Sequence, residues 1–112
     1  MSEPEPESVM SRLAAVVEHR HQTRPGGSYT AELFNDGHDV IAAKVVEEAY
    51  ELIAAAGEPD PVDRQAVTAE AADLIYHVLV LLKSVDVSWK FVERELQQRF
   101  GTSGLTEKAN RP

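Results

Sequence analysis

The sequence contains no cysteine, which excludes disulfides, thiolate zinc sites and a cysteine nucleophile. It also lacks a long hydrophobic run, since an apolar stretch such as Val78 to Leu82 is far shorter than the roughly 20 residues that span a bilayer. The opening segment "MSEPEPES" has neither the basic start nor the apolar stretch of a signal peptide. These absences predict a cytoplasmic protein with no membrane partner.

Positive charge is scarce as well. The chain has 11 lysines and arginines against 19 aspartates and glutamates, which gives a formal net charge of −8. Proteins that neutralise a phosphate backbone need the opposite sign, so the composition argues against nucleic-acid binding. An anionic ligand would need a metal ion or a few local cations to mediate the contact. The length of 112 residues, 43% of them hydrophobic, is typical of one small folded domain.

Strand-type alternation is nowhere convincing, whereas apolar residues recur at steps of three and four. Glycine and proline punctuate these segments, and Ser88 is placed to cap the last of them. We expect helices over residues 8–20, 38–56, 63–84 and 89–100, with a short one within 28–37. The sequence therefore predicts an all-α domain over residues 9–100, a four-to-five-helix bundle, between a disordered acidic tail (1–8) and a C-terminal tail (101–112).

The expected helix over residues 63–84 loses its polar face in its second half. From Leu74 to Leu82 almost every side chain is apolar. A helix that is apolar all round is buried all round, and a small monomer has few ways to surround one. We therefore expect a second subunit to cover part of this helix and to complete the bundle as a homodimer.

Two acidic pairs of equal spacing occur on consecutive helices. Glu48 and Glu51 are three residues apart, and so are Glu70 and Asp73, which places each pair on one helix face. A short connection makes the two helices antiparallel neighbours. At the usual separation of about 8 to 10 Å between helix axes, the two pairs can converge on one point.

Four converging carboxylates would repel one another unless a cation lies between them. Oxygen-only ligands favour Mg²⁺ or Mn²⁺ over zinc or copper. Glu47 points about 100° away from Glu48, where it can hold a second ion, orient a water or act as a general base. The alternative is that these residues form a solvated helix face. A di-iron site is disfavoured because neither pair has the Glu-x-x-His form.

Other candidate residues leave two readings open. Lys44 lies one turn before Glu48 and can contact a phosphate or simply pair with a glutamate. His77 follows Asp73 by four residues, and its ring can bond to that carboxylate or find its partners in the core. The glycine-led segment from Gly26 to Thr30 can wrap a phosphate with backbone N–H groups or form a plain turn.

Taken together, "GSYTAELFNDG", "KVVEEAYEL", "EAADLIYHVLVLL" and "GTSGLTEKA" resemble the phosphoribosyl-ATP pyrophosphohydrolase family. This family belongs to the all-α nucleotide pyrophosphatase (MazG-like) superfamily. The superfamily pattern E-E-x-x-E followed by E-x-x-D is matched by Glu47, Glu48, Glu51, Glu70 and Asp73. The "SYT" segment, the "YH" pair and the "GTSGL" tail point to the histidine-biosynthesis enzymes. Ala43 and His38 depart from the family pattern, which bears on fine substrate contacts.

The resemblance implies Mg²⁺-dependent hydrolysis of phosphoribosyl-ATP to phosphoribosyl-AMP and pyrophosphate, with cleavage between the α and β phosphates. It implies a helical homodimer with sites near the subunit interface. It assigns the five acidic residues of the pattern as catalytic metal ligands. The residues that we expect to contact substrate are Lys44, Ser28, Tyr29, Thr30, His77 and Lys108, with Arg111 as a further tail cation.

Two other functions fit the acidic pattern. One is a housecleaning pyrophosphatase that acts on a canonical or damaged nucleoside triphosphate. The other is a helical dimer that binds Mg²⁺ or a partner helix without catalysis.

Overall fold

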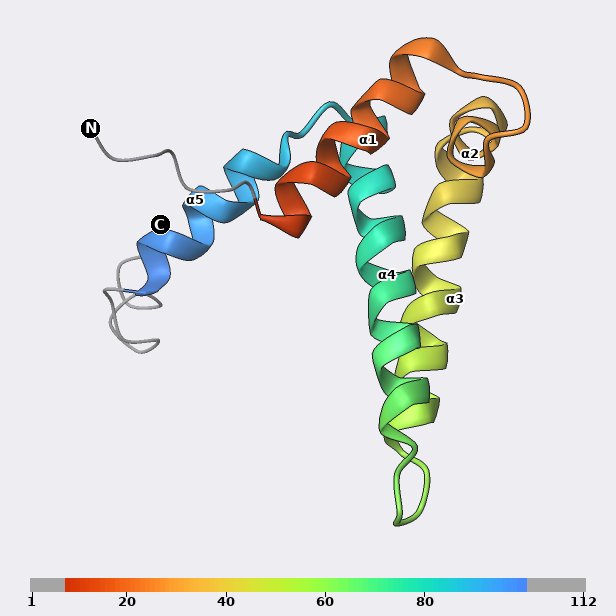
Figure 1. Ribbon diagram of the computed structural model, residues 1–112, viewed down its shortest axis with the longest axis vertical. Coiled ribbons are helices and arrows are strands. Elements are labelled where there is room, and N and C mark those ends of the chain that lie inside the picture. Colours follow the sequence, from red (N-terminus) through yellow and green to blue (C-terminus); the bar gives the residue numbers. More distant parts are fainter. Residues whose placement is uncertain (1–7, 101–112) are drawn as a thin grey trace.

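A computed structural model of the chain describes residues 8–100, which form five α-helices and no strand. Figure 1 shows their arrangement. The helices are α1 (Val9–Thr23), α2 (Tyr29–Asp36), α3 (His38–Ala56), α4 (Arg64–Ser84) and α5 (Trp89–Phe100). The all-α class and the five predicted helices are confirmed. The predicted tails, apart from Ser8, lie outside the described residues, as do Lys108 and Arg111.

The helix boundaries follow from capping residues. The side chains of Ser8, Ser28 and Asp63 accept backbone N–H groups at the starts of α1, α2 and α4, at 3.1, 3.2 and 3.1 Å. Asp63 is therefore the cap of α4 rather than its first residue. The first helix runs three residues beyond its predicted end because nothing interrupts it before Arg24, which adopts a left-handed conformation (φ 48°) just ahead of Pro25.

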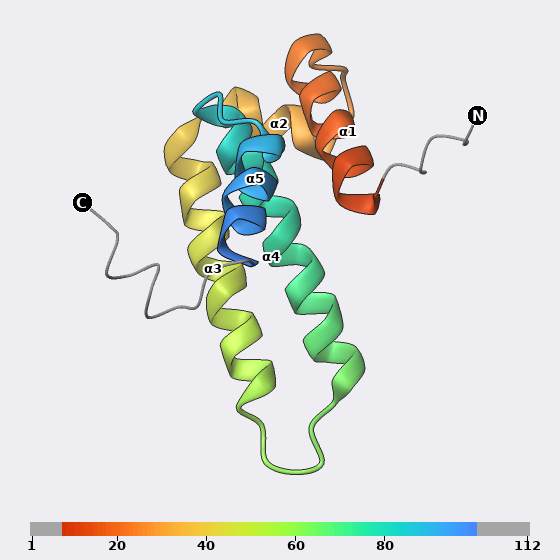
Figure 2. The same cartoon turned by 90° about the vertical axis from the view of Figure 1, so that its left-hand side faces the viewer.

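The longest helices, α3 and α4, run antiparallel as a hairpin and share the most extensive contact in the described structure. Both Figure 1 and Figure 2 show them side by side, joined by a loop at one end of the molecule. Helices α1 and α2 contact the hairpin near its opposite end. Helix α5 projects away from the hairpin in Figure 1, contacts α1 and contains no buried residue.

The hydrophobic core lies at the end of the hairpin where α1 and α2 meet it. Its buried members are Val17, Leu33, Phe34, Ile41, Leu79 and Val80. These residues come from α1, α2, the first turn of α3 and the second half of α4. The core therefore fixes one end of the hairpin and leaves the middle of α3 and α4 free to carry polar side chains.

A matched pair of substitutions tests this core. Val17 is 1% exposed, whereas its neighbour Val16 on the same helix is 47% exposed. Val17→Ala is expected to lower the free energy of unfolding by about 2 to 3 kcal/mol, because it removes two buried methyl groups and leaves a cavity. Val16→Ala should change the free energy of unfolding by less than about 0.5 kcal/mol. Urea denaturation of both variants measures the difference, and equal effects would contradict the described packing.

The second half of α4 is covered on one side only within a single copy of the chain. His77, Leu79 and Val80 are buried, but Ile75 remains 43% exposed. The expectation that this helix is buried all round is therefore not met by one copy, because α1, α2 and α3 contact one side of it. By length and composition α4 would also suit a membrane span, a property that the core helices of soluble proteins share.

Candidate active site

The hairpin brings acidic side chains from two helices together. Glu48 and Glu51 on α3 and Glu70 on α4 each offer one carboxylate oxygen, and these three oxygens lie within 4.8 Å of one another. The spacing of three residues puts Glu48 and Glu51 on the same face of α3, and the antiparallel packing sets Glu70 opposite them. The structure thus gathers three of the four paired carboxylates at one point.

Two of these carboxylates have an oxygen that is buried and without a partner. Glu48 is 8% exposed, and the Oε2 atoms of Glu48 and Glu70 make no hydrogen bond within the described residues. A buried polar atom without a partner is costly, and a buried negative charge more so. A cation between the carboxylates would satisfy both oxygens at once. The oxygen-only donor set suits a hard divalent ion such as Mg²⁺.

The electrostatics of the cluster point the same way. The pKa of Glu48 is raised, first by burial and then by the charges of Glu51 and Asp73. The pKa of Glu70 is raised, first by burial and then by the neighbouring carboxylates of Glu51, Glu48 and Asp73. The carboxylates therefore hold more negative charge than their surroundings favour. A divalent ion would reverse this effect and keep them ionised.

Asp73 and Glu47 lie outside the group of three. The charge of Asp73, three residues from Glu70 on α4, raises the pKa of both Glu48 and Glu70. Glu47 is turned toward Lys44 on the same helix, with Oε2 and Nζ 3.4 Å apart. Lys44 therefore pairs with Glu47 rather than with Glu48, and this pair stands beside the carboxylate cluster.

Each residue of the predicted "SYT" segment has a defined partner. The Ser28 side chain caps α2 by accepting the Ala31 N–H. The Tyr29 hydroxyl lies 2.9 Å from Nε2 of His77, and the Thr30 hydroxyl is hydrogen-bonded to the Tyr76 hydroxyl. The N-terminus of α2 is thus fixed to α4 by two neighbouring hydrogen bonds. Tyr76 was not among the predicted site residues. The feature that could have indicated it is that the consecutive residues of "YT" bond to the consecutive residues of "YH".

His77 finds its partners in the core. Its side chain is 5% exposed, and Nδ1 lies 2.8 Å from the backbone carbonyl oxygen of Asp73. His77 therefore bonds to the backbone carbonyl of Asp73 rather than to its carboxylate, and to the Tyr29 hydroxyl on its other side. The reason is local, because a ring at position i+4 of a helix reaches the carbonyl of the preceding turn.

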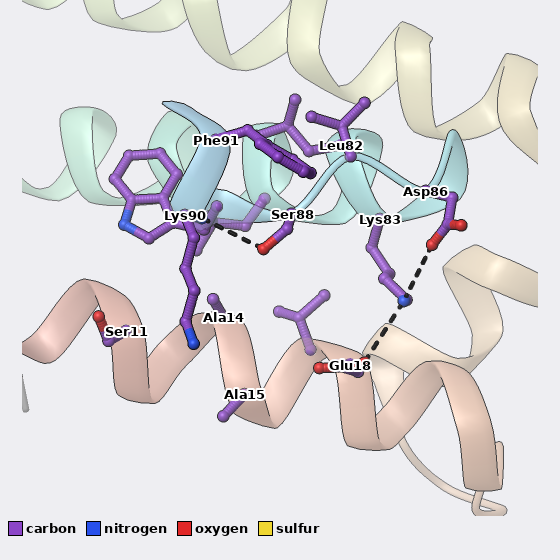
Figure 3. Close-up of a pocket in the computed structure, with 14 residues that line it drawn as sticks. Ser11, Ala14, Ala15, Glu18, Leu82, Lys83, Asp86, Ser88, Lys90 and Phe91 are labelled. Atoms are coloured by element: carbon purple, nitrogen blue, oxygen red, sulfur yellow. Dashed lines mark hydrogen bonds and ion pairs between the residues drawn. The ribbon is translucent and has the colours of Figure 1, made fainter. Parts of the chain in front are cut away.

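A separate pocket lies away from the carboxylates. A pocket of about 490 Å³ lies between α1 and the corner that joins α4 to α5, and Figure 3 shows the residues around it. Its two carboxylates, Glu18 and Asp86, share one ion-pair partner, the Lys83 ammonium, at 3.6 and 3.5 Å. None of the predicted site residues lines this pocket. The close group of carboxylates with buried oxygens lies instead between α3 and α4.

Comparison with known proteins gives a consistent result. The family model for phosphoribosyl-ATP pyrophosphohydrolase matches residues 10–100. Proteins named phosphoribosyl-ATP pyrophosphatase from Rhodopirellula baltica, Jannaschia sp. and Caulobacter sp. are 49%, 48% and 48% identical to this chain. These similarities cover 96%, 91% and 93% of this chain and 91%, 97% and 94% of the respective relatives. The resemblance seen in the motifs thus extends over nearly the whole sequence.

Proposed function

The chain belongs to the phosphoribosyl-ATP pyrophosphohydrolase family, and from this we propose that it hydrolyses phosphoribosyl-ATP to phosphoribosyl-AMP and pyrophosphate in histidine biosynthesis. The observation that carries the proposal is the meeting of Glu48, Glu51 and Glu70 between α3 and α4 in a chain with these relatives. A biosynthetic reaction on a soluble nucleotide also favours a cytoplasmic location.

We propose Mg²⁺ as the cofactor, with Mn²⁺ as the alternative. Glu48, Glu51 and Glu70 would hold it, with Asp73 and Glu47 as the further ligands of the acidic pattern. The fit rests on the two buried carboxylate oxygens that lack a partner and on the donor set, which contains oxygen alone. When bound, the ion supplies charge neutralisation at the phosphates and activation of water.

Residues of the chain would bind the phosphates and orient the attacking water. The carboxylates exclude a triphosphate that arrives without cations, because like charges repel. The Lys44 ammonium, next to the cluster, contacts a phosphate and stabilises the charge that develops on the departing pyrophosphate. Lys44 would then leave its present partner, Glu47, and the Glu47 carboxylate would be free to accept a hydrogen bond from water. Water adds to the α phosphorus and gives a proton to Glu47, the bond from this phosphorus to the bridging oxygen breaks, and pyrophosphate leaves with that oxygen.

A nucleotide panel tests the proposal. Purified protein is mixed with Mg²⁺ and single nucleotides, and pyrophosphate release is measured. We expect release from phosphoribosyl-ATP, loss of release on chelation, and recovery with Mg²⁺ or Mn²⁺. Release from a deoxynucleoside triphosphate but not from phosphoribosyl-ATP would indicate the housecleaning function instead. The absence of pyrophosphate release from every nucleotide, including phosphoribosyl-ATP, would favour a binding module without catalysis.

We also propose that the chain works as a homodimer. Val46, Tyr50 and Ile53 form an exposed apolar stripe along α3, 70%, 74% and 69% exposed, and Ile75 is uncovered on α4. A contiguous apolar surface of this kind marks an interaction site more often than a free surface. Light scattering of the purified protein should give twice the chain mass of 12.3 kDa. A mass of one chain at micromolar concentration would contradict the dimer.

A further inference from the structure

The hydrogen bond between Tyr29 and His77 has a direction that follows from the other bond of a neutral His77 ring. Nδ1 of His77 lies 2.8 Å from the backbone carbonyl oxygen of Asp73, and a carbonyl oxygen can only accept. Nδ1 therefore carries a hydrogen. In a neutral imidazole this leaves Nε2 as an acceptor. The Tyr29 hydroxyl, 2.9 Å away, must then donate its single hydrogen to His77.

A tyrosine that donates inward offers only lone pairs outward. Tyr29 is 47% exposed, whereas His77, which takes its hydrogen, is 5% exposed. Within the described residues no donor is found on the Tyr29 hydroxyl oxygen. The open side of this hydroxyl therefore accepts a hydrogen bond and gives none. An ionised phosphate oxygen is also an acceptor, so it is a poor partner for Tyr29, whereas a sugar hydroxyl is a suitable donor.

The position of Tyr29 indicates which ribose of the substrate its hydroxyl contacts. The Tyr29 hydroxyl bonds to His77, whose Nδ1 bonds to the backbone carbonyl of Asp73, so the hydroxyl lies beside the turn of α4 that carries Asp73 and follows Glu70. Burial raises the pKa of Tyr29, and the charges of Lys44, Glu48, Glu47 and Asp73 act on it as well. If the cluster holds the triphosphate through divalent ions, the nearest group rich in hydroxyls is the ribose esterified to the α phosphate.

We propose that Tyr29 accepts a hydrogen bond from a hydroxyl of the ribose that carries the triphosphate, and that it thereby selects ribonucleotide over deoxynucleotide substrates. His77 acts as a positioning residue, because it takes the Tyr29 hydrogen. The bond between Thr30 and Tyr76 and the Ser28 cap hold the backbone on either side. The inference rests on the proposed function and explains the "SYT" segment as a sugar-reading element rather than a phosphate loop.

The experiment compares three substrates: phosphoribosyl-ATP and its analogues that lack the 2′ or the 3′ hydroxyl on the triphosphate-bearing ribose. We expect the wild-type chain to prefer phosphoribosyl-ATP over one of the analogues by about tenfold in kcat/KM, the value of one hydrogen bond at its upper range. In Tyr29→Phe the preference should fall to less than about twofold, because the ring remains and the acceptor is gone.

Two substitutions of His77 separate positioning from folding. His77→Gln keeps an acceptor for the Tyr29 hydrogen and should retain part of the preference. His77→Phe has no acceptor, so it should lose the preference as Tyr29→Phe does. The preference is a ratio on one protein, so a general loss of folded enzyme leaves it unchanged. Thermal denaturation of each variant confirms that the compared proteins are folded.

The outcomes separate this inference from the function on which it rests. If Tyr29→Phe keeps the wild-type preference, or lowers kcat/KM equally on all three substrates, Tyr29 does not read the sugar and the inference is overturned. An equal loss would instead indicate that Tyr29 donates to a phosphate. If the wild-type chain releases no pyrophosphate from phosphoribosyl-ATP, the proposed function fails before any comparison is made.

Discussion

Glu51→Gln is expected to lower the turnover of phosphoribosyl-ATP by about 100-fold or more at saturating Mg²⁺, the scale of losing a central electrostatic group. An oxygen of Glu51 lies within 4.8 Å of the ligand oxygens of Glu48 and Glu70. The amide keeps the size of the side chain but removes the negative charge that a divalent ion needs. Glu51 is exposed, so the substitution disturbs little packing. Steady-state pyrophosphate release measures the loss.

The same substitution should stabilise the chain when divalent ions are absent. The charge of Glu51 raises the pKa of both Glu48 and Glu70, which means that ionising these groups costs folding free energy. Removing that charge relieves the repulsion, so the melting temperature in a chelator should rise while turnover falls. A substitution that merely damaged the fold would lower both. Opposite signs therefore identify Glu51 as a ligand rather than a structural residue.

Glu58→Gln provides the control for this test. Glu58 is an exposed carboxylate in the connection between α3 and α4, outside the group of three. The same change of charge there should leave turnover and the metal-free melting temperature close to those of the wild type. Asp73→Asn should lower turnover on the same scale as Glu51→Gln. Near-normal turnover in both Glu51→Gln and Asp73→Asn would refute the assignment of these carboxylates as metal ligands.

The helices could be predicted because their signals are local. Helix α3 spans residues 38–56 as expected, since Gly37 and Gly57 bound an uninterrupted apolar stripe. Helix α5 follows Ser88 as the capping pattern indicated. The end of α1 was less accurate, because the apolar pattern fades after Val17 while the backbone stays helical until Arg24.

The candidate site was predictable only where spacing along a helix decides it. The interval of three residues placed Glu48 and Glu51 on one face of α3, and the short connection placed Glu70 opposite them. The bond between Tyr29 and His77 joins residues 48 positions apart, so no local pattern could reveal it. Lys44 was ambiguous for a similar reason, because its choice of Glu47 depends on side-chain rotation rather than on spacing.

Without divalent ions, the stability of the chain is expected to fall as the pH rises above the ordinary carboxylate range. The pKa values of Glu48 and Glu70 are raised above 4.5 in the folded state. The folded chain therefore binds more protons than the unfolded chain in the window that opens at this value. The stabilising effect of protonated Glu48 and Glu70 is complete below pH 4.5 and is lost as the pH rises through their raised pKa values. Mg²⁺ should remove the loss by compensating the ionised carboxylates.

Thermal denaturation across this window, with and without Mg²⁺, measures the effect, but His21 acts in the opposite direction. Burial and the charge of Arg24 lower the pKa of His21. The contribution of His21 to stability is therefore present above its ordinary pKa and is lost as the pH falls from there through the lowered pKa. Comparing the wild type with Glu51→Gln removes the contribution of His21 to the pH dependence, because His21 is present in both proteins. In a chelator the wild type should lose more stability than Glu51→Gln as the pH rises, and Mg²⁺ should stabilise the wild type more. Parallel pH profiles that Mg²⁺ leaves unchanged would show that the three carboxylates do not share a cation.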